Sequence, residues 1–183
     1  MTAENKTTWP TLRLGDVITL HRGYDLPVGE IQNGSHPVVF SNGKTEYHNK
    51  YKVNGPGVVT GRSGTLGNVF YLDKNYWPHN TTLYVSDFKG NDPKYIYYLL
   101  KGSKFEKWNA GSGVPTLNRN HVHEMEIAFP VDPREQKQIA ETVSVFDEKI
   151  ENNNKIIKTL EEMAQAIFKE WFICGSIGKE KVV

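Results

Sequence analysis

Apolar positions follow two different spacings along this 183-residue chain, and the change falls near residue 131. Before that point, short apolar runs alternate with turn signals such as Asn33-Gly34 and Asn54-Gly55. The pattern predicts short strands over residues 17–20, 37–40, 58–60, 69–72, 82–85 and 125–129. So many short strands favour a curled sheet or a partial barrel.

One helix is predicted inside this first part. Asp92 can cap it, Pro93 suits its first position, and Gly102 can end it. Ser103 is then expected to cap a shorter helix that runs to Trp108. The first part is therefore predicted to be mostly β with one or two short helices. The apolar face of the first helix would consist of Tyr95, Ile96, Leu99 and Leu100.

After residue 131 the pattern becomes that of one long helix. Asp132 is expected to cap it, Pro133 to take its first position, Glu135 to complete a capping box, and Gly175 to end it. Apolar positions then recur in steps of four and three residues, which is the signature of a coiled-coil seam. The predicted seam consists of Ile139, Val143, Phe146, Ile150, Asn153, Ile157, Leu160, Ala164, Ile167 and Trp171.

The length of this helix implies a partner. A helix of about 40 residues is about 60 Å long, whereas a unit of about 130 residues is only about 30 Å across. The helix is therefore expected to extend beyond the first unit and to need another helix against its apolar stripe. No second helix of that length is predicted in this chain, so a second copy is the simplest supplier.

Asn153 is the polar exception in the seam, and it lies near the middle of the predicted helix. In an antiparallel homodimer, the middle residue meets its own copy at the two-fold axis. A polar pair there can fix the register of the two helices. A solvated defect in a weak seam is the alternative interpretation.

The predicted fold class is α+β. A mostly-β unit is expected over residues 1–131, a long helix over 132–174, and a flexible tail over 175–183. Charge also divides near residue 131: residues 1–131 hold 14 Lys plus Arg and 11 Asp plus Glu, a net of +3, whereas the rest hold 8 and 10, a net of −2. This shift in composition favours two structural units.

No catalytic set emerges from the sequence. Glu135 and Lys137 match the Glu-x-Lys of many metal-dependent nucleases, but they open a helix, where capping explains them. His121 and His123 could bind a metal, but no third ligand is evident, and histidines at a strand start are more often surface or hydrogen-bonded groups. Cys174, at a helix end, has no arranged base. We therefore expect no catalytic residues and no metal site, and binding becomes the default function.

The same features predict the compartment. The chain contains no apolar window long enough to span a membrane, and its N-terminus lacks an apolar signal region. With a single cysteine, no internal disulfide is possible. The expected compartment is a reducing cytoplasm.

The polar loops of the first part suit a nucleic-acid reader. The loop at 61–65 places an arginine and two hydroxyls on a glycine-flexed turn, and arginine can bond guanine O6 and N7. Ordinary turn chemistry is the alternative for each loop taken alone. The net charge of +3 is modest, so tight DNA binding by this chain alone is not expected. The predicted DNA contacts are Lys44, Tyr47, Arg62, Ser63, Thr65, Asn80, Asn118 and Arg119.

These residues also carry a family resemblance, which extends over residues 9–173. The chain resembles the specificity subunit of type I restriction–modification systems, and more closely a half-length version of it. The most specific segments are Gly-Val-Pro-Thr-Leu-Asn at 113–118, Phe-Pro at 129–130, Arg-Glu-Gln-Lys-Gln-Ile-Ala at 134–140 and Ala-Ile-Phe-Lys-Glu-Trp-Phe at 166–172.

The resemblance implies a target recognition domain followed by a spacer helix, with no catalysis by this subunit. It implies double-stranded DNA and methyltransferase subunits as partners. S-adenosylmethionine would then be bound by the methyltransferase, and no cofactor by this chain. Translocase–endonuclease subunits would join the same complex.

The chain departs from the full-length pattern, which has two recognition domains and two spacer helices where this chain has one of each. An antiparallel homodimer would rebuild that arrangement and read a bipartite target with identical, inverted half-sites. The alternative is an oligomerisation or adaptor module that binds no DNA, or an inactive truncated specificity subunit.

Overall fold

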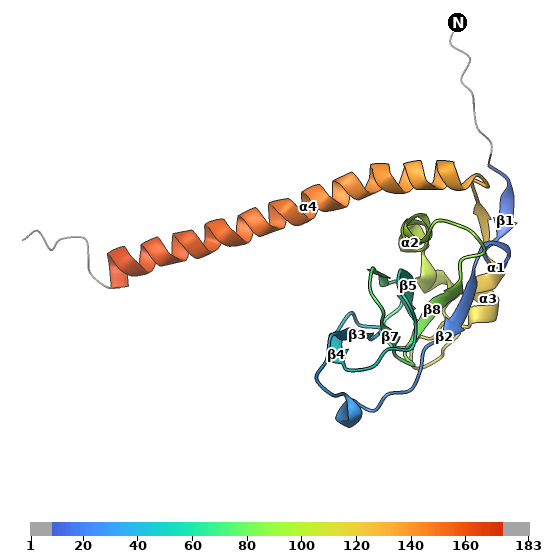
Figure 1. Ribbon diagram of the computed structural model, residues 1–183, viewed down its shortest axis with the longest axis horizontal. Coiled ribbons are helices and arrows are strands. Elements are labelled where there is room, and N and C mark those ends of the chain that lie inside the picture. The colour runs from blue at the N-terminus through green and yellow to red at the C-terminus, as the bar shows by residue number, and fades with distance from the viewer. Residues whose placement is uncertain (1–8, 174–183) are drawn as a thin grey trace, which may run out of the picture. The chain divides into compact units, whose positions relative to one another are not determined.

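The computed structural model describes residues 9–173 (Figure 1). The chain divides into two compact units, which we call the N-terminal unit, Met1–Ala140, and the C-terminal unit, Glu141–Val183. The predicted α+β class is confirmed, since several small sheets are followed by a long helix. The predicted flexible tail, Cys174 and the helix end at Gly175 lie outside the described residues.

A four-stranded antiparallel sheet forms the centre of the N-terminal unit. Its strands lie in the order β2-β8-β5-β6. β5 and β6 follow each other along the chain, whereas β8 pairs with β2 and β5, which are more distant from it in sequence. The predicted strands over 58–60, 69–72 and 82–85 are confirmed within this sheet. The strands are β2 (Thr19–Arg22), β8 (Thr82–Asp87), β5 (Gly57–Gly61) and β6 (Val69–Leu72).

Two smaller sheets accompany it, rather than the one curled sheet that the sequence predicted. The first has the order β4-β3-β7, with β3 at His36–Val39, β4 at Thr45–His48 and β7 at Trp77–Pro78. The second pairs β1 (Thr11–Arg13) with β9 (Glu126–Ala128), which confirms the predicted strand near residue 127.

The prediction of a strand over 17–20 is only partly right. Residues Leu14–Val17 form the short helix α1, and β2 begins at Thr19. One helical turn places Leu14 and Val17 on the same side, and both are buried in the core. Val17, which was predicted to begin a strand, therefore belongs to a helical turn that precedes the strand.

Helix α2 (Pro93–Gly102) matches the prediction, and the Asp92 carboxylate caps it by accepting a hydrogen bond from Tyr95 N at 2.7 Å. The predicted Ser103 cap is wrong, because its hydroxyl donates back to Leu99 O at 2.9 Å. The segment after it is a 3₁₀ helix, η2 (Phe105–Trp108). A further 3₁₀ turn, η1, lies at Val28–Glu30.

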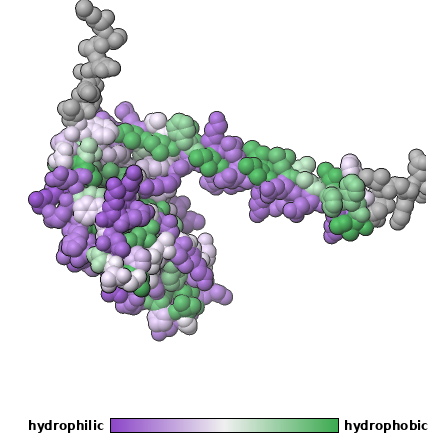
Figure 2. All heavy atoms as spheres, turned by 180° about the vertical axis from the view of Figure 1, so that it is seen from behind, coloured by the Kyte–Doolittle hydropathy of each residue, from purple (hydrophilic) through white to green (hydrophobic). Residues whose placement is uncertain are grey.

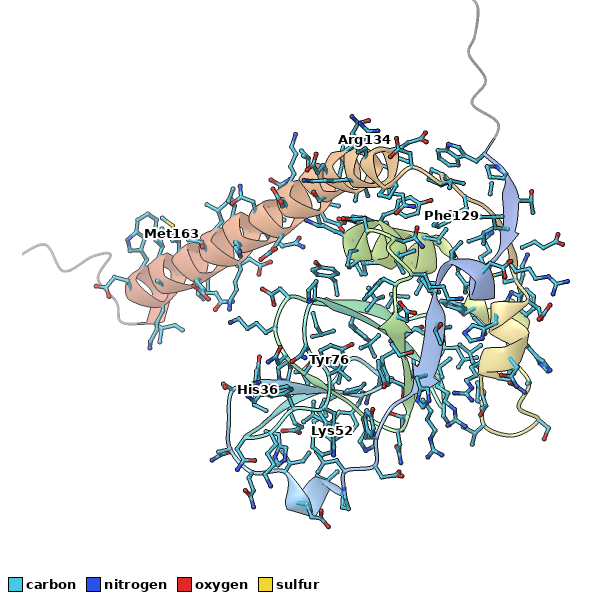
Figure 3. The ribbon with its side chains drawn as sticks, turned by 45° about the vertical axis from the view of Figure 1, so that its right-hand side comes forward. His36, Lys52, Tyr76, Phe129, Arg134 and Met163 are labelled. Atoms are coloured by element: carbon cyan, nitrogen blue, oxygen red, sulfur yellow. The ribbon has the colours of Figure 1, made fainter. Side chains whose placement is uncertain are left out.

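The main core lies between the four-stranded sheet and the helices that cover it (Figure 1). Helix α2 packs on β5 and β6, while α1 and α3 (Arg119–His123) pack together beside β2. Phe129 lies in this core, with its ring 5.6 Å from that of Tyr95 on α2 (Figure 3). The core consists mainly of Leu14, Ile18, Leu20, Val58, Leu83, Val85, Ile96, Leu100, Phe105, Leu117, Val122 and Phe129.

The predicted strand start at His121 and His123 is wrong, since both residues lie in α3. The His123 ring accepts a hydrogen bond at Nε2 from Leu20 N, at 2.9 Å, and so joins α3 to β2. Burial, followed by the nearby charges of Arg119 and Lys89, lowers the pKa of His123, which favours this neutral acceptor form. Within residues 9–173, no three potential metal ligands gather.

The long helix α4 runs from Pro133 to Phe168 and continues as one π-helical segment, η3, over Lys169–Ile173. Asp132 caps it as predicted, with its carboxylate accepting from Arg134 N at 2.9 Å. The predicted capping box is wrong among the described residues: the Glu135 carboxylate accepts instead from the indole of Trp9, at 3.0 Å.

The first turns of α4 belong to the N-terminal unit and are held there by Gln136, which is fully buried. Its side-chain oxygen accepts from Asp92 N at 2.9 Å, and its amide nitrogen donates to Asn91 Oδ1 and Pro130 O, both at 2.8 Å. Such a fully satisfied buried amide fixes local geometry at little cost. Residues 9–173 contain no helix long and apolar enough to cross a membrane.

Candidate DNA interface

Two loops that are far apart in sequence lie against each other at the end of β5. Arg62 N donates to Thr81 O at 2.9 Å, and Arg62 O accepts from Leu117 N at 2.8 Å. Gly64 N donates to Pro115 O at 2.9 Å, and Ser63 forms a bridge with Thr116. The backbone of the loop at 61–65 is therefore held by hydrogen bonds to two other segments, one at Thr81 and one at residues 115–117.

The sharp turn of this loop explains its first glycine. A Cβ at Gly61 would lie 2.0 Å from Thr65 O, a distance that no side chain can tolerate. Gly61 thus lets the chain fold back directly after β5, which presents Arg62 beside the loop at 115–119. The glycine-flexed turn inferred from the sequence has this physical basis.

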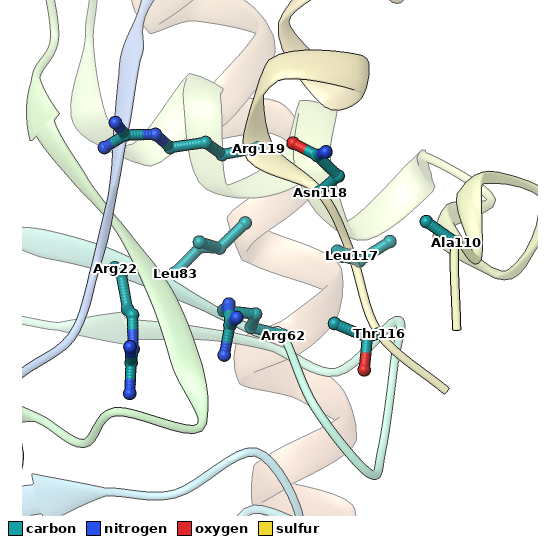
Figure 4. A pocket seen from close by; sticks show the side chains of 8 residues that line it. All are labelled: Arg22, Arg62, Leu83, Ala110, Thr116, Leu117, Asn118 and Arg119. Atoms are coloured by element: carbon teal, nitrogen blue, oxygen red, sulfur yellow. The ribbon is translucent and has the colours of Figure 1, made fainter. Parts of the chain in front are cut away.

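Together these loops and β2 form an open pocket of about 510 Å³ (Figure 4). Three arginines reach it from three separate segments of the chain. Its apolar walls are the side chains of Leu83 and Leu117, both buried in the core. The lining residues are Arg22, Arg62, Leu83, Ala110, Thr116, Leu117, Asn118 and Arg119.

The arginines of the pocket are poorly neutralised by the protein. Burial, and then the neighbouring charge of Arg22, lowers the pKa of Arg62. Arg22 makes one loose ion pair, 3.7 Å from the Asp25 carboxylate. Within residues 9–173, the guanidinium groups of Arg62 and Arg119 have no ion pair and no side-chain hydrogen bond. The pocket therefore favours an anionic or acceptor-rich ligand.

Asn118 has two roles at the rim. Its carbonyl oxygen accepts from Asn120 N at 3.0 Å and so caps α3. Its amide nitrogen has no partner among the described residues, so it remains available as a donor. The pocket thus unites three of the predicted contacts: Arg62, Asn118 and Arg119.

The other predicted contacts lie in neighbouring hollows. Ser63 pairs with Thr116 at the edge of the arginine pocket. Thr65 lies in an adjacent hollow of about 340 Å³, next to Glu106. Asn80 hydrogen-bonds Asp25 and lines another hollow of about 270 Å³ beside His79.

Lys44 directly precedes β4, Tyr47 lies in β4, and neither lines the arginine pocket. The Lys44 ammonium lies 2.5 Å from the Glu46 carboxylate, which lowers its value as a phosphate contact. Tyr47 is exposed in a separate hollow of about 400 Å³. Tyr47 therefore belongs to a strand, β4, that was not among the strands predicted from the sequence.

Sequence reasoning missed Arg22 and the contribution of β2. In the sheet, Arg22 is paired with Leu83 on β8, and Leu83 is paired with Thr60 on β5. Arg62 follows Thr60 by two residues, so the sheet register brings Arg22 to its side. No signal in the sequence gives this pairing, because it depends on the strand order β2-β8-β5.

The fold and the pocket define a mostly-β binding module with a basic, donor-rich recess, attached to a long helix. Comparison with known proteins identifies its family. Residues 6–162 match the family model described as the type I restriction modification DNA specificity domain, so the chain belongs to this family. The resemblance read from the sequence is thereby confirmed.

Curated relatives and a solved structure agree. A putative type I specificity subunit of Mycoplasma genitalium is 31% identical over 180 residues, covering 90% of this chain and 45% of the relative. The MjaIX specificity subunit of Methanocaldococcus jannaschii is 39% identical over 84 residues, covering 44% of this chain and 19% of that protein. The crystal structure of an S subunit from M. genitalium shares the fold, with a TM-score of 0.77 and 23% identity, covering 96% of this chain and 49% of that one.

The chain thus spans about half the length, or less, of the relatives it matches. The relatives are named specificity subunits, which are non-catalytic recognition components. The expectation that this chain is not itself an enzyme is therefore confirmed.

Proposed function

We propose that this chain recognises double-stranded DNA for a type I restriction–modification complex, and that the arginine pocket is its principal DNA contact. The observation that carries the proposal is the convergence of Arg22, Arg62 and Arg119 on one open pocket without acidic partners for two of them. DNA offers both phosphates and base-edge acceptors to such a group. The family described above supports the same assignment.

We further propose that the chain acts as a homodimer through α4. From Val143 onward the predicted seam is exposed, with Phe146 at 64% and Leu160 at 57% of their full accessibility. Ile156 and Met163, which flank the seam, are exposed as well, so the apolar stripe is broad (Figures 2 and 3). Exposed apolar stripes of this kind are typical of helices that pair with another helix.

Ile139 is an exception to the predicted seam. It packs against the core of the N-terminal unit and is only partly exposed. The proposed dimer contacts therefore begin at Val143. They are Val143, Phe146, Ile150, Asn153, Ile157, Leu160, Ile167 and Trp171.

An antiparallel homodimer would carry its two recognition units in opposite orientations. Its DNA target would then be bipartite, with identical and inverted half-sites, because the symmetry of the dimer is mirrored in the DNA. The length of the paired helices would set the gap between the half-sites. The faces of α4 outside the stripe would remain for the methyltransferase subunits.

The methyltransferase would hold S-adenosylmethionine and carry out the chemistry, while this chain would bind no cofactor. A restriction subunit would join in systems that also cleave DNA. In this account the complex works on chromosomal DNA in the cytoplasm.

Methylome sequencing tests this function. The chain is expressed with the methyltransferase subunit of a type I system, in cells that lack other such systems. The expected result is methylation at one bipartite motif with inverted half-sites. The control replaces both Arg62 and Arg119 by alanine, which should abolish that methylation or spread it over sequences that share no motif. Methylation without any inverted bipartite motif would contradict the homodimer, and unchanged methylation in the control would contradict the assignment of the pocket.

A further inference from the structure

The arginine pocket offers hydrogen-bond donors and almost no free acceptors. Arg22, Arg62 and Arg119 are pure donors, and the free atom of the Asn118 amide is its nitrogen. The Thr116 hydroxyl donates to Val114 O at 3.0 Å, so toward a ligand its oxygen can only accept. Donors still outnumber acceptors in the pocket, which favours a ligand that presents acceptors.

The three arginines differ in how firmly they are held. Arg62 is half-buried, and its backbone is clamped by Thr81 on one side and Leu117 on the other. Arg119 is exposed at the first position of α3, and Arg22 is exposed and paired loosely with Asp25. Arg62 is therefore the arginine whose side chain extends from the most firmly held backbone.

The surroundings of Arg62 suit a base edge better than a phosphate. It lies between Arg22 and Thr116 in Figure 4, with the apolar side chains of Leu83 and Leu117 in the same pocket. A phosphate has no apolar face to place against these leucines, and its contacts tolerate loose geometry. A base carries an apolar ring edge beside its polar atoms, so it can approach such a wall without a large desolvation cost.

Among the bases, the donor-rich character of the pocket favours one. In the major groove, guanine presents two adjacent acceptors, O6 and N7, whereas adenine and cytosine each present a donor and thymine a single acceptor with a methyl group. The guanidinium fork of Arg62 matches the two acceptors of guanine.

From this geometry we infer that Arg62 reads one guanine of each half-site through O6 and N7 in the major groove, while Arg119 contacts the adjacent phosphate. The inference rests on the proposed function and deepens it, since it assigns a base to one residue and a backbone contact to another. Arg22, next to Arg62, stabilises the anionic strand and keeps the Arg62 guanidinium turned toward the DNA.

Selection of bound duplexes from a random library tests the inference, with the chain assembled with its methyltransferase subunits, as wild type and as four variants. Wild type should enrich a motif that contains guanine at a fixed position of each half-site. Arg62→Ala should enrich the same motif with that one position degenerate. Arg62→Lys, which keeps the charge but loses the fork, should be degenerate there too. Lys74→Ala removes an exposed charge outside the pocket and should leave the base preferences unchanged.

Arg119→Ala should behave differently. It should weaken binding to all sequences alike, with no change in base preference, and lower the slope of log affinity against log salt by about one. A loss of base preference at one position in this variant would mean that Arg119 contacts a base, and the assignment of Arg119 to the phosphate would be wrong.

Modified bases sharpen the test. Replacing the selected guanine with 7-deazaguanine, which lacks N7, should weaken wild-type binding by about fivefold to 150-fold and leave Arg62→Ala unaffected. Inosine, which keeps O6 and N7 and lacks only the minor-groove amino group, should bind wild type as well as guanine does.

The outcomes distinguish failure of the inference about Arg62 from failure of the proposed function. If wild type enriches a motif but Arg62→Ala or Arg62→Lys keeps guanine at every position, the inference is wrong and DNA recognition stands. Equal binding of 7-deazaguanine duplexes by wild type leads to the same conclusion. If wild type enriches no sequence, the proposed function itself fails, and the inference fails with it.

Discussion

The N-terminal and C-terminal units contain similar apolar side chains but place them in opposite environments. In the N-terminal unit, residues such as Ile96, Leu100 and Phe105 are fully buried in a core that the unit closes by itself. In the C-terminal unit, Ile150, Ile157 and Leu160 are each more than half exposed. Figure 2 shows the apolar residues that follow the helix. The N-terminal unit buries its apolar side chains by itself, whereas the C-terminal unit leaves its apolar side chains exposed.

The difference also separates the two tasks of the chain. A closed core holds the arginine pocket in a fixed geometry, which sequence reading requires. An open apolar stripe cannot stabilise an isolated helix, because helices gain most of their stability from packing an amphipathic face. We therefore expect changes in the stripe to affect assembly, and changes in the core to affect folding.

The largest effect is predicted for a charge in the middle of the stripe. Leu160→Glu should raise the dissociation constant of the dimer by at least about a hundredfold, because each copy loses a buried leucine and must desolvate a carboxylate. The melting of the N-terminal unit should not change. Analytical ultracentrifugation and calorimetry measure the two properties. Asn152→Glu adds the same charge outside the seam and should leave the dimer intact, so equal effects of the two variants would contradict the assigned stripe.

The next effect concerns the N-terminal unit alone. Gln136→Leu should lower its free energy of unfolding by about 3 kcal/mol, because Asp92 N, Pro130 O and the Asn91 carbonyl lose their buried partner. Chemical denaturation measures the loss. The exposed Gln138→Leu is the matched control and should remain within about 0.5 kcal/mol of wild type. A neutral Gln136→Leu would mean that these three bonds contribute little to holding the first turns of α4.

A smaller effect of opposite sign is predicted at Asn153. Asn153→Ile should tighten the dimer by about tenfold, because an apolar side chain replaces a polar one in the seam. The register should become less well defined, which cysteine cross-linking along α4 can measure. Asn152→Ile, outside the seam, is the control for added hydrophobicity. If Asn153→Ile weakens the dimer instead, Asn153 does not lie in the seam.

The smallest effect is a pH dependence confined to the N-terminal unit. The pKa of His123 is lowered from 6.5 by burial and neighbouring positive charges, so the folded state favours the neutral ring. The stability from this group is complete above pH 6.5 and is lost as the pH falls through the folded pKa. His123→Gln keeps an acceptor for Leu20 N but does not titrate there. Its free energy of unfolding should depend less on pH below 6.5 than that of wild type, and an equal dependence would contradict the role of His123.

The sequence predicted best the features that depend on local chemistry. The caps at Asp92 and Asp132, the strands at 58–60, 69–72 and 82–85, and the α+β class all follow from spacing and turn residues. The helix α3 was missed because four of its five residues are polar and its capping Asn118 was taken for a base contact. The strand β4 was missed because it has no alternation of apolar and polar residues: its buried residue is a histidine, His48, which packs on Trp77.

The candidate site was predicted only in part, because the rest of it is formed by tertiary structure. Arg62 and Asn118 stand out in glycine- and asparagine-rich loops, and their loops do meet. Arg22 joins them only through the register of β2, β8 and β5, which no local pattern encodes. Lys44 and Tyr47 were chosen for composition alone, and the fold places them before and within β4, in a different sheet.

The mass of the purified chain in solution shows whether α4 pairs with a second copy. One chain has a mass of 20.8 kDa. We expect a species of two copies at micromolar concentration by native mass spectrometry, which Leu160→Glu converts to single chains. A wild-type chain that remains a single copy under these conditions, with its stripe exposed, would contradict the claim that a second copy completes the helix.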